Sequence, residues 1–184
     1  MRLLSLEVAG FRGFATKQTF DLDADAVIVV GANGNGKTSL FDAVLWAITG
    51  RIPRLGKDDS LLACRFSEAG QTRVVLRLGR VDRSLALTVT RVFDGTVTRV
   101  SVETPEGVLR GPEAEGRLIQ LIWKEAATAA SPGEALATAL TRSVYLQQDL
   151  VRDFIDSVTA QERFSAVSEL VGAGRVTDLQ AELE

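Results

Sequence analysis

The chain has 184 residues, 46% hydrophobic and 24% charged, which is enough to bury a core and makes one large domain the default expectation. A net charge of −3 excludes attraction of the whole chain to nucleic acid, so any DNA contact must come from a local patch or a partner. The absence of histidine excludes histidine-based catalysis, and a single cysteine, Cys64, excludes an internal disulfide and fits a reducing cytoplasm. No apolar run reaches the roughly 18 residues of a membrane span, so a cytoplasmic protein outside the membrane is expected.

The N-terminal part of the chain predicts two strands that lead into a glycine-rich loop. Residues 2–8 are apolar at alternate positions, which is typical of a half-buried strand. A turn is expected at residues 10–13 and a second strand over residues 16–22. The continuous apolar run over residues 26–30 predicts a third strand, buried on both faces.

Residues 31–38 read Gly-Ala-Asn-Gly-Asn-Gly-Lys-Thr, a full match to the phosphate-binding pattern G-x-x-x-x-G-K-[ST]. Such a loop binds anions because glycines let it curl until successive N–H groups face phosphate oxygens, and the following helix adds positive charge. Lys37 is expected to reach the β- and γ-phosphates, and the Thr38 hydroxyl to bind Mg²⁺. The run 39–49, apolar almost all round, predicts a buried helix that ends at Gly50. We therefore predict nucleotide binding.

The middle of the chain predicts an antiparallel sheet beside this nucleotide core. Three β-rich runs cover residues 72–78, 84–93 and 96–102. Asp94-Gly95 between the last two is typical of a tight hairpin.

The C-terminal third predicts mainly helices. Pro112 opens a helix that runs to about Glu125, and residues 126–139 form either a mobile linker or a short helix. A short strand is expected over residues 143–147, and a capping box at residues 159–162 begins a helix that ends near residue 172.

The last residues predict the beginning of a coiled coil. Val176, Leu179 and Leu183 follow the spacing of a coiled-coil seam, although a plain amphipathic helix is the alternative. The expected organisation is a lobe over residues 1–172 and the start of a coiled-coil helix over residues 173–184, in a piece of a longer protein.

Several of these motifs, in this order, resemble the N-terminal lobe of SMC-type ATPases, most closely the branch of SbcC and Rad-fifty. The motifs are Phe11-Arg12-Gly13-Phe14, the glycine loop with the run 39–43 behind it, the Gln-Gln stretch at residues 145–149, and residues 162–172. The resemblance implies an α/β fold of the P-loop NTPase class: the N-terminal lobe of an ABC-type ATPase head, with an antiparallel sheet and the start of a coiled coil. ATP and Mg²⁺ are the implied cofactors.

The resemblance also implies roles for individual residues. Lys37 and Gln148 are the implied catalytic residues, and Thr38 and Gln148 the implied ligands of Mg²⁺, with Gln147 as the neighbouring alternative for Gln148. The implied nucleotide-binding residues are Arg12, Gly31, Asn33, Gly34, Asn35, Gly36, Lys37, Thr38 and Ser39. Taken by themselves, Arg12 also fits a solvated turn and the two glutamines the end of a strand. Asp42 is expected to serve the structure, and the apolar residues of the run 40–48, Phe41 included, are expected in the core.

The implied function is an ATPase that couples ATP binding and hydrolysis to DNA-end processing, repair or DNA tethering. The sequence holds neither an apolar strand ending in Asp-Glu (Walker B) nor a Ser-Gly-Gly-type signature motif, both of which lie in the family's C-terminal lobe. The chain by itself is therefore expected to be nearly inactive. The implied partners are that lobe of the same protein, a second head in an ATP-sandwiched homodimer, and double-stranded DNA, with an SbcD-type nuclease as a candidate.

Three other functions fit parts of the sequence. The nucleotide-binding domain of an ABC transporter shares the loop, but the wide separation of Lys37 from Gln148 and the coiled-coil start disfavour it. A nucleotide-gated dimerisation module without catalysis remains an alternative. A small P-loop kinase or GTPase is a third, but the sequence lacks the Asn-Lys-x-Asp motif that selects GTP.

Overall fold

The structure is a computed structural model that describes residues 1–143, with the exception of residues 57 and 83. The chain divides into two compact units, residues 1–134 and 135–184, of which the second is described over residues 135–143. The predicted capping-box helix and coiled-coil start, and both glutamines of the Gln-Gln stretch, lie outside the described residues. The predicted strand at 143–147 also lies there except for Ser143, which ends a helix.

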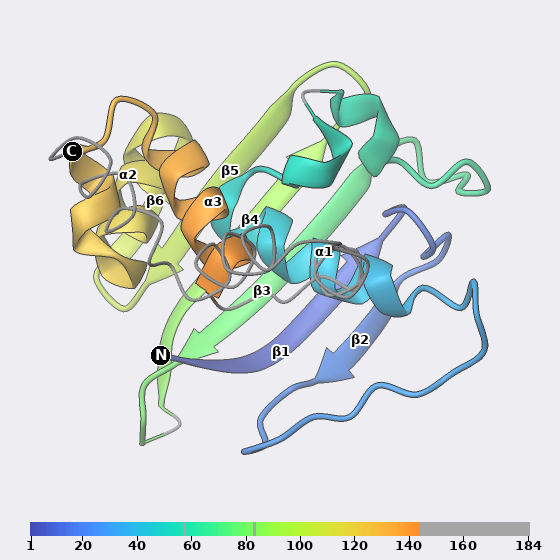
Figure 1. Ribbon diagram of the computed structural model, residues 1–184, viewed down its shortest axis with the longest axis horizontal. Helices are drawn as coiled ribbons and strands as arrows, with labels where there is room; N and C mark the ends of the chain where they lie inside the picture. The colour runs from blue at the N-terminus through green and yellow to red at the C-terminus, as the bar shows by residue number, and fades with distance from the viewer. Residues whose placement is uncertain (57, 83, 144–184) are drawn as a thin grey trace, which may run out of the picture. The chain divides into compact units, whose positions relative to one another are not determined.

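A six-stranded antiparallel sheet forms the body of the first unit, with the strand order β2-β1-β3-β4-β5-β6 (Figure 1). The strands are β1 (Arg2–Ala9), β2 (Gln18–Asp21), β3 (Thr72–Gly79), β4 (Leu85–Phe93), β5 (Thr98–Thr104) and β6 (Gly107–Arg110). The five strands predicted at residues 2–8, 16–22, 72–78, 84–93 and 96–102 are confirmed, with β2 shorter than expected and β5 beginning two residues later. The turn between β4 and β5 therefore covers residues 94–97 and is longer than the predicted two-residue hairpin. The four-residue β6 is an additional strand that pairs with β5.

The apolar positions of neighbouring strands coincide, which fixes the register of the sheet. Leu76 of β3 lies opposite Leu6 of β1 and opposite Val89 of β4, and all three side chains are fully buried. On the other face of β3, Arg73 and Arg77 are exposed. A one-residue slip would exchange the two faces and bury the arginines, so this register is strongly specified.

Two helices pack on the buried face of this sheet. Helix α1 (Lys37–Thr49) contacts β3 and β4, α2 (Gly111–Ile122) contacts β5 and β6, and the two helices touch each other. Both helices are confirmed, although α2 stops three residues early because Trp123 is extended and returns its N–H to Ile119. Short 3₁₀ turns cover Pro53–Leu55, Asp59–Leu62 and Lys124–Thr128, and α3 (Pro132–Ser143) confirms the short-helix alternative for its region.

A buried arginine fixes the C-terminal end of α1. Gly50 ends the helix with its N–H bonded to the Trp46 carbonyl. Arg91 of β4, 2% exposed, donates from Nε to the Ala47 carbonyl at 3.0 Å and from Nη1 to Glu115 of α2 at 2.7 Å. One side chain thereby joins β4, α1 and α2.

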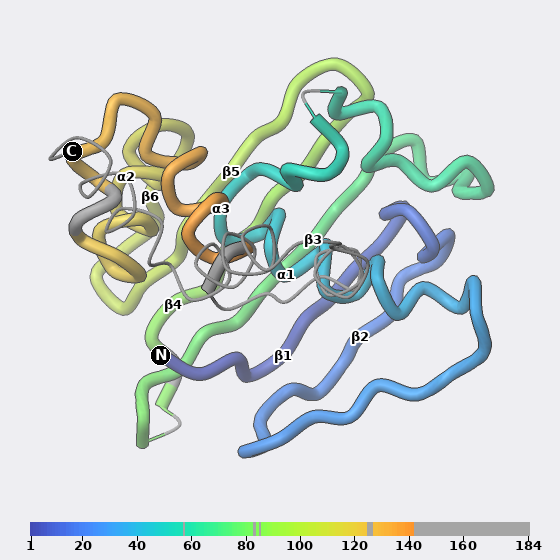
Figure 2. Tube along the Cα trace, viewed as in Figure 1, coloured from blue at the N-terminus to red at the C-terminus, as the bar shows by residue number. Residues whose placement is uncertain are grey.

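The predicted buried strand at residues 26–30 is wrong for the described chain. The segment runs as a connecting stretch that belongs to no sheet (Figure 2). Val27, Ile28 and Val30 are exposed, the last two by 85% each. Strand structure requires a hydrogen-bonded neighbour, and no strand of the described residues pairs with this run. The run is apolar, as the sequence shows, but the prediction that it is buried is wrong for the described residues.

A hollow of about 380 Å³ continues this apolar surface. Its lining includes Val27, Val29, Leu40, Phe41 and Val44, so it extends from the exposed segment onto α1. Phe41 is 46% exposed, which corrects the prediction that it belongs to the core. The other apolar residues of α1 are buried or packed against the core, as predicted.

Candidate nucleotide-binding site

The lysine of the glycine loop folds back into the loop itself. Its Nζ donates to the carbonyl of Gly31 at 2.8 Å and to the carbonyl of Ala32 at 2.9 Å. These bonds curl the loop around the ammonium group directly before α1, whose first residue is Lys37. The first turn of α1 carries no acidic residue, so the positive end of the helix dipole is not offset there.

Gly36 requires glycine for two separate reasons. Its φ of 81° lies in the left-handed region, which side chains disfavour. A Cβ at this position would also stand 3.2 Å from the ring of Phe14. The sharp turn into α1 is therefore made against an aromatic side chain from the Phe-Arg-Gly-Phe turn.

That turn, residues 11–14, lies directly against the start of α1. A Cβ on Gly13 would stand 3.2 Å from the Gly36 Cα and 3.3 Å from the Ser39 Oγ, so the two segments are in close contact. Phe11 is fully buried and stacks at a tilt on Trp46 of α1, with 5.6 Å between ring centroids. Two motifs that are separated in sequence are thereby brought together.

Arg12 points from this turn toward α1. Its backbone adopts a φ of 46°, rare for a residue with a side chain, and its N–H is bonded to the Leu62 carbonyl at 2.9 Å. Its guanidinium Nε lies 3.1 Å from Oδ2 of Asp42, one turn beyond Thr38 on the helix. This ion pair is more than a solvated turn residue would make, and the position of Arg12 near the nucleotide phosphates stays a prediction.

Asp42 is completely buried and is shared by two arginines. Arg54 donates from Nε to Oδ1 at 3.2 Å and also contacts Oδ2 through Nη2, so it spans both oxygens. Burial raises the pKa of the Asp42 carboxyl, and the hydrogen bond and charge of Arg54 together with the charge of Arg12 oppose that rise. Asp42 serves the structure, as expected from the sequence.

The site is locally basic in a chain that is acidic overall. Lys37, Arg12 and Arg54 bring three positive charges to the first turns of α1, where the carboxylate of Asp42 pairs with the two arginines. A net charge summed over the chain hides this cluster. The sequence analysis did not single out Arg54, because the 3₁₀ turn that carries it after α1 has no recognisable motif, and only the fold brings Arg54 to Asp42.

The remaining predicted site residues are arranged as follows. Gly31, Asn33, Gly34 and Asn35 form the exposed part of the loop, and Thr38 is exposed in the first turn of α1. Ser39 is buried beside Gly13. Their contacts with a nucleotide stay predictions, as does the role of Gln148, which lies outside the described residues.

The described residues fit Mg²⁺ bound through a nucleotide. They contain no group of three or more Cys, Asp or Glu side chains able to hold a metal by themselves. Mg²⁺ is commonly held by one or two protein oxygens together with substrate phosphates, so a single hydroxyl such as that of Thr38 suits it. The described residues also include no helix with the length and apolarity needed to cross a membrane.

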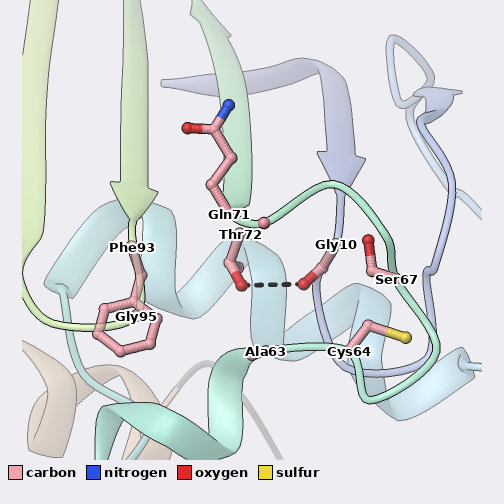
Figure 3. Close-up of a pocket in the computed structure, with 9 residues that line it drawn as sticks. Gly10, Ala63, Cys64, Ser67, Gln71, Thr72, Phe93 and Gly95 are labelled. Carbon is pink, nitrogen blue, oxygen red and sulfur yellow. Dashed lines mark hydrogen bonds between the residues drawn. The ribbon is translucent and has the colours of Figure 1, made fainter.

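A separate hollow of about 220 Å³ lies at the end of the sheet where β1 leads into the turn at residues 11–14 (Figure 3). Its lining is uncharged and includes Cys64, Ser67 and Phe93. Thr72 closes one side by donating its hydroxyl to the Gly10 carbonyl at 2.9 Å. Without charged groups, this hollow lacks the means to bind a polyphosphate.

Comparison with known proteins decides the family. Residues 5–170 match the family described as an AAA domain. The chain belongs to this family, among the SMC/Rad50-type ATPases. It is 34% identical over 106 residues to the chromosome partition protein Smc of Rhodopirellula baltica, which covers 56% of the chain and 8% of that protein. It is 32% identical over 123 residues to the probable DNA double-strand break repair Rad50 ATPase of Aquifex aeolicus, covering 66% of the chain and 12% of that protein.

The fold agrees with that of a solved SMC ATPase. A structure from work on "ATP-driven dimerization and DNA stimulated activation of SMC ATPases" superimposes with a TM-score of 0.61 at 19% identity, covering 92% of this chain and 99% of that one. The α/β P-loop class and the antiparallel sheet are thus confirmed. This chain corresponds to the N-terminal portion of an SMC/Rad50-type ATPase head. It spans only 8–12% of the two relatives described above.

Proposed function

We propose that the chain binds Mg-ATP in the glycine loop and becomes an active ATPase when a C-terminal lobe completes the head. The observation that carries the proposal is the loop itself: Lys37 is held at the Gly31 and Ala32 carbonyls, at the positive end of α1. A triphosphate would meet an ammonium, backbone N–H groups and Arg12 in one place. Thr38 would contribute its hydroxyl to Mg²⁺.

The exposed apolar segment supports the part of the proposal that concerns a second lobe. Residues 27–30 and the hollow beside them leave aliphatic side chains and backbone groups open next to the loop. Strands of a second lobe added along this segment would cover both the side chains and the backbone groups, and would make it the buried strand that the sequence predicts. Groups acting on the transferred phosphoryl can be worth about 10³–10⁵ in rate, so the chain without them should hydrolyse ATP near background.

The wider role proposed is the coupling of ATP to work on DNA. Two heads would enclose ATP between them, and DNA contact would depend on that pairing because the chain has a net charge of −3. The relatives include both a chromosome partition protein and a probable double-strand break repair ATPase. DNA tethering and DNA-end processing, with an SbcD-type nuclease as a candidate partner, are therefore both compatible with the proposal.

The experiment is calorimetric titration of Mg-ATP into the chain and into Lys37→Ala. Removing the ammonium removes a gross Coulomb interaction of up to about 4 kcal/mol at 4 Å and an effective dielectric constant of 20, so binding should become too weak to measure or fall by orders of magnitude. Lys17→Ala is the matched control, because Lys17 is paired with Glu7 on the sheet. Equal affinity of the Lys37 variant and the wild type would refute the site.

A further inference from the structure

We infer that Arg54 is a positioning residue that controls whether Arg12 stays on Asp42 or turns to a bound phosphate. The inference rests on the proposed nucleotide site, because it concerns the delivery of Arg12 to that site. It assigns a role to Arg54, which belongs to no recognisable motif. In this role, Asp42 and the phosphate compete for the guanidinium of Arg12.

The geometry gives the two arginines unequal shares of one carboxylate. Arg54 contacts both oxygens of Asp42, through Nε at 3.2 Å from Oδ1 and through Nη2 on Oδ2. Arg12 approaches Oδ2 through Nε at 3.1 Å, and its Nη1 makes a long bond of 3.3 Å to the Leu61 carbonyl. Since both cations share Oδ2, the charge of Arg54 weakens the hold of Asp42 on Arg12.

The position of Arg12 allows it to change partner. The turn that carries it touches Gly36 and Ser39, so its guanidinium starts within one helical turn of the loop that would hold the phosphates. Its side chain keeps 22% exposure, whereas Asp42 has none. A phosphate bound at the loop would offer Arg12 a second anion of higher charge close at hand.

Arg54 makes the exchange of Arg12 energetically possible. A buried carboxylate without a counterion is strongly unfavourable, so Arg12 alone on Asp42 could not leave. With Arg54 spanning both oxygens, Asp42 stays neutralised and hydrogen-bonded after Arg12 departs. Without Arg54, Arg12 would stay on Asp42 and could not reach the nucleotide.

The test measures the dissociation constant of Mg-ATP by calorimetry for the 184-residue chain and a set of variants. Arg54→Gln should weaken binding roughly tenfold, within the usual range of coupling between sites, although Arg12 is still present. Asp42→Asn removes the competitor, so it should bind Mg-ATP as tightly as the wild type or tighter. The double variant Arg54→Gln with Asp42→Asn should regain the affinity of Asp42→Asn, and adding Arg12→Gln to it should lower the affinity again.

A matched control separates this role from loss of stability. Arg91→Met loosens the other end of the same helix without reaching Arg12, so it should lower the unfolding midpoint and leave the Mg-ATP affinity unchanged. If Arg54→Gln does not fold, the double variant still tests the inference, because removing the Asp42 charge together with the Arg54 charge leaves no unpaired carboxylate in the core. Weaker binding by the double variant than by Asp42→Asn would mean that Arg54 itself contacts the nucleotide, and would overturn the inference.

Two further results would overturn the inference and leave the proposed function intact. One is wild-type affinity in Arg54→Gln, and the other is a loss of affinity in Asp42→Asn as large as in Arg12→Gln. Failure of the proposed function is different, because the wild-type chain would then not bind Mg-ATP, or Lys37→Ala would bind it equally well.

Discussion

At the scale of the residue, the molecule depends on a few charged side chains buried along α1. Asp42 lies in the second turn of α1 with two arginines, and Arg91 lies at the end of α1 with the Ala47 carbonyl and Glu115. Burial lowers the pKa of Arg91, and its hydrogen bond and ion pair with Glu115 oppose that shift. Such groups hold a helix in one position more strictly than apolar packing alone, because each has few acceptable partners.

Replacing Arg91 tests this arrangement. Arg91→Met keeps most of the volume but leaves the Ala47 carbonyl without its donor, so we expect a loss of about 1–3 kcal/mol in the free energy of unfolding. Urea denaturation should show a lower midpoint and an unchanged m-value. A more stable variant would show that the cost of burying the guanidinium exceeds the worth of its bonds.

At the scale of the element, the β4–β5 hairpin illustrates how a short turn is specified. The Asp94 carboxylate accepts from the backbone N–H groups of Thr96 at 3.0 Å and Val97 at 2.9 Å, and from Arg99 at 2.6 Å. The two backbone bonds, and then Arg99, lower the pKa of Asp94 to about 2. This explains why Asp-Gly is a reliable hairpin signal: the side chain satisfies the turn's own donors.

The pH dependence of stability follows from that shift. The folded-state pKa lies below the unfolded value of 3.8, so the hairpin's contribution is present above the unfolded pKa and is lost as pH falls toward about 2. In acid titrations of stability, the difference between the wild type and Asp94→Asn should shrink over this window. Arg99→Gln should keep most of the dependence, since the backbone bonds are the larger cause. A parallel slope in Asp94→Asn would contradict the assignment.

At the scale of the whole molecule, the exposed apolar surface around residues 27–30 sets this chain apart from a self-sufficient domain. Ile28 and Val30 are each 85% exposed beside a hollow lined by α1. Contiguous apolar surface of this kind typically marks an interface. The same surface is continuous in sequence with the glycine loop, so under the proposed function the lobe that covers it would also lie beside the nucleotide.

Polar replacements on this surface should separate folding from assembly. Ile28→Ser with Val30→Ser should change the stability of the isolated chain by less than about 0.5 kcal/mol, because both side chains are already exposed. Binding to the C-terminal lobe should weaken by roughly a hundredfold or more, since burial of the two aliphatic side chains at about 1.5–3 kcal/mol each amounts to about 3–6 kcal/mol. Val81→Ser, 82% exposed on the β3–β4 turn, is the control. Wild-type affinity for the lobe in the double variant would exclude this surface as the interface.

The local pattern of the sequence was sufficient for most of the secondary structure and for the loop. Alternation located β1, β-rich runs located β3–β5, Gly50 and Pro112 marked helix boundaries, and residues 31–38 predicted a phosphate-binding loop, because these signals depend on neighbours close in the chain. The tertiary structure decided the rest: the pairing of Arg12 and Arg54 on Asp42, the insertion of Arg91 between two helices, and the exposure of residues 26–30. Each of these features depends on which segment, distant in the sequence, packs against the residue in question. The pattern of hydrophobic residues along the chain does not specify that segment.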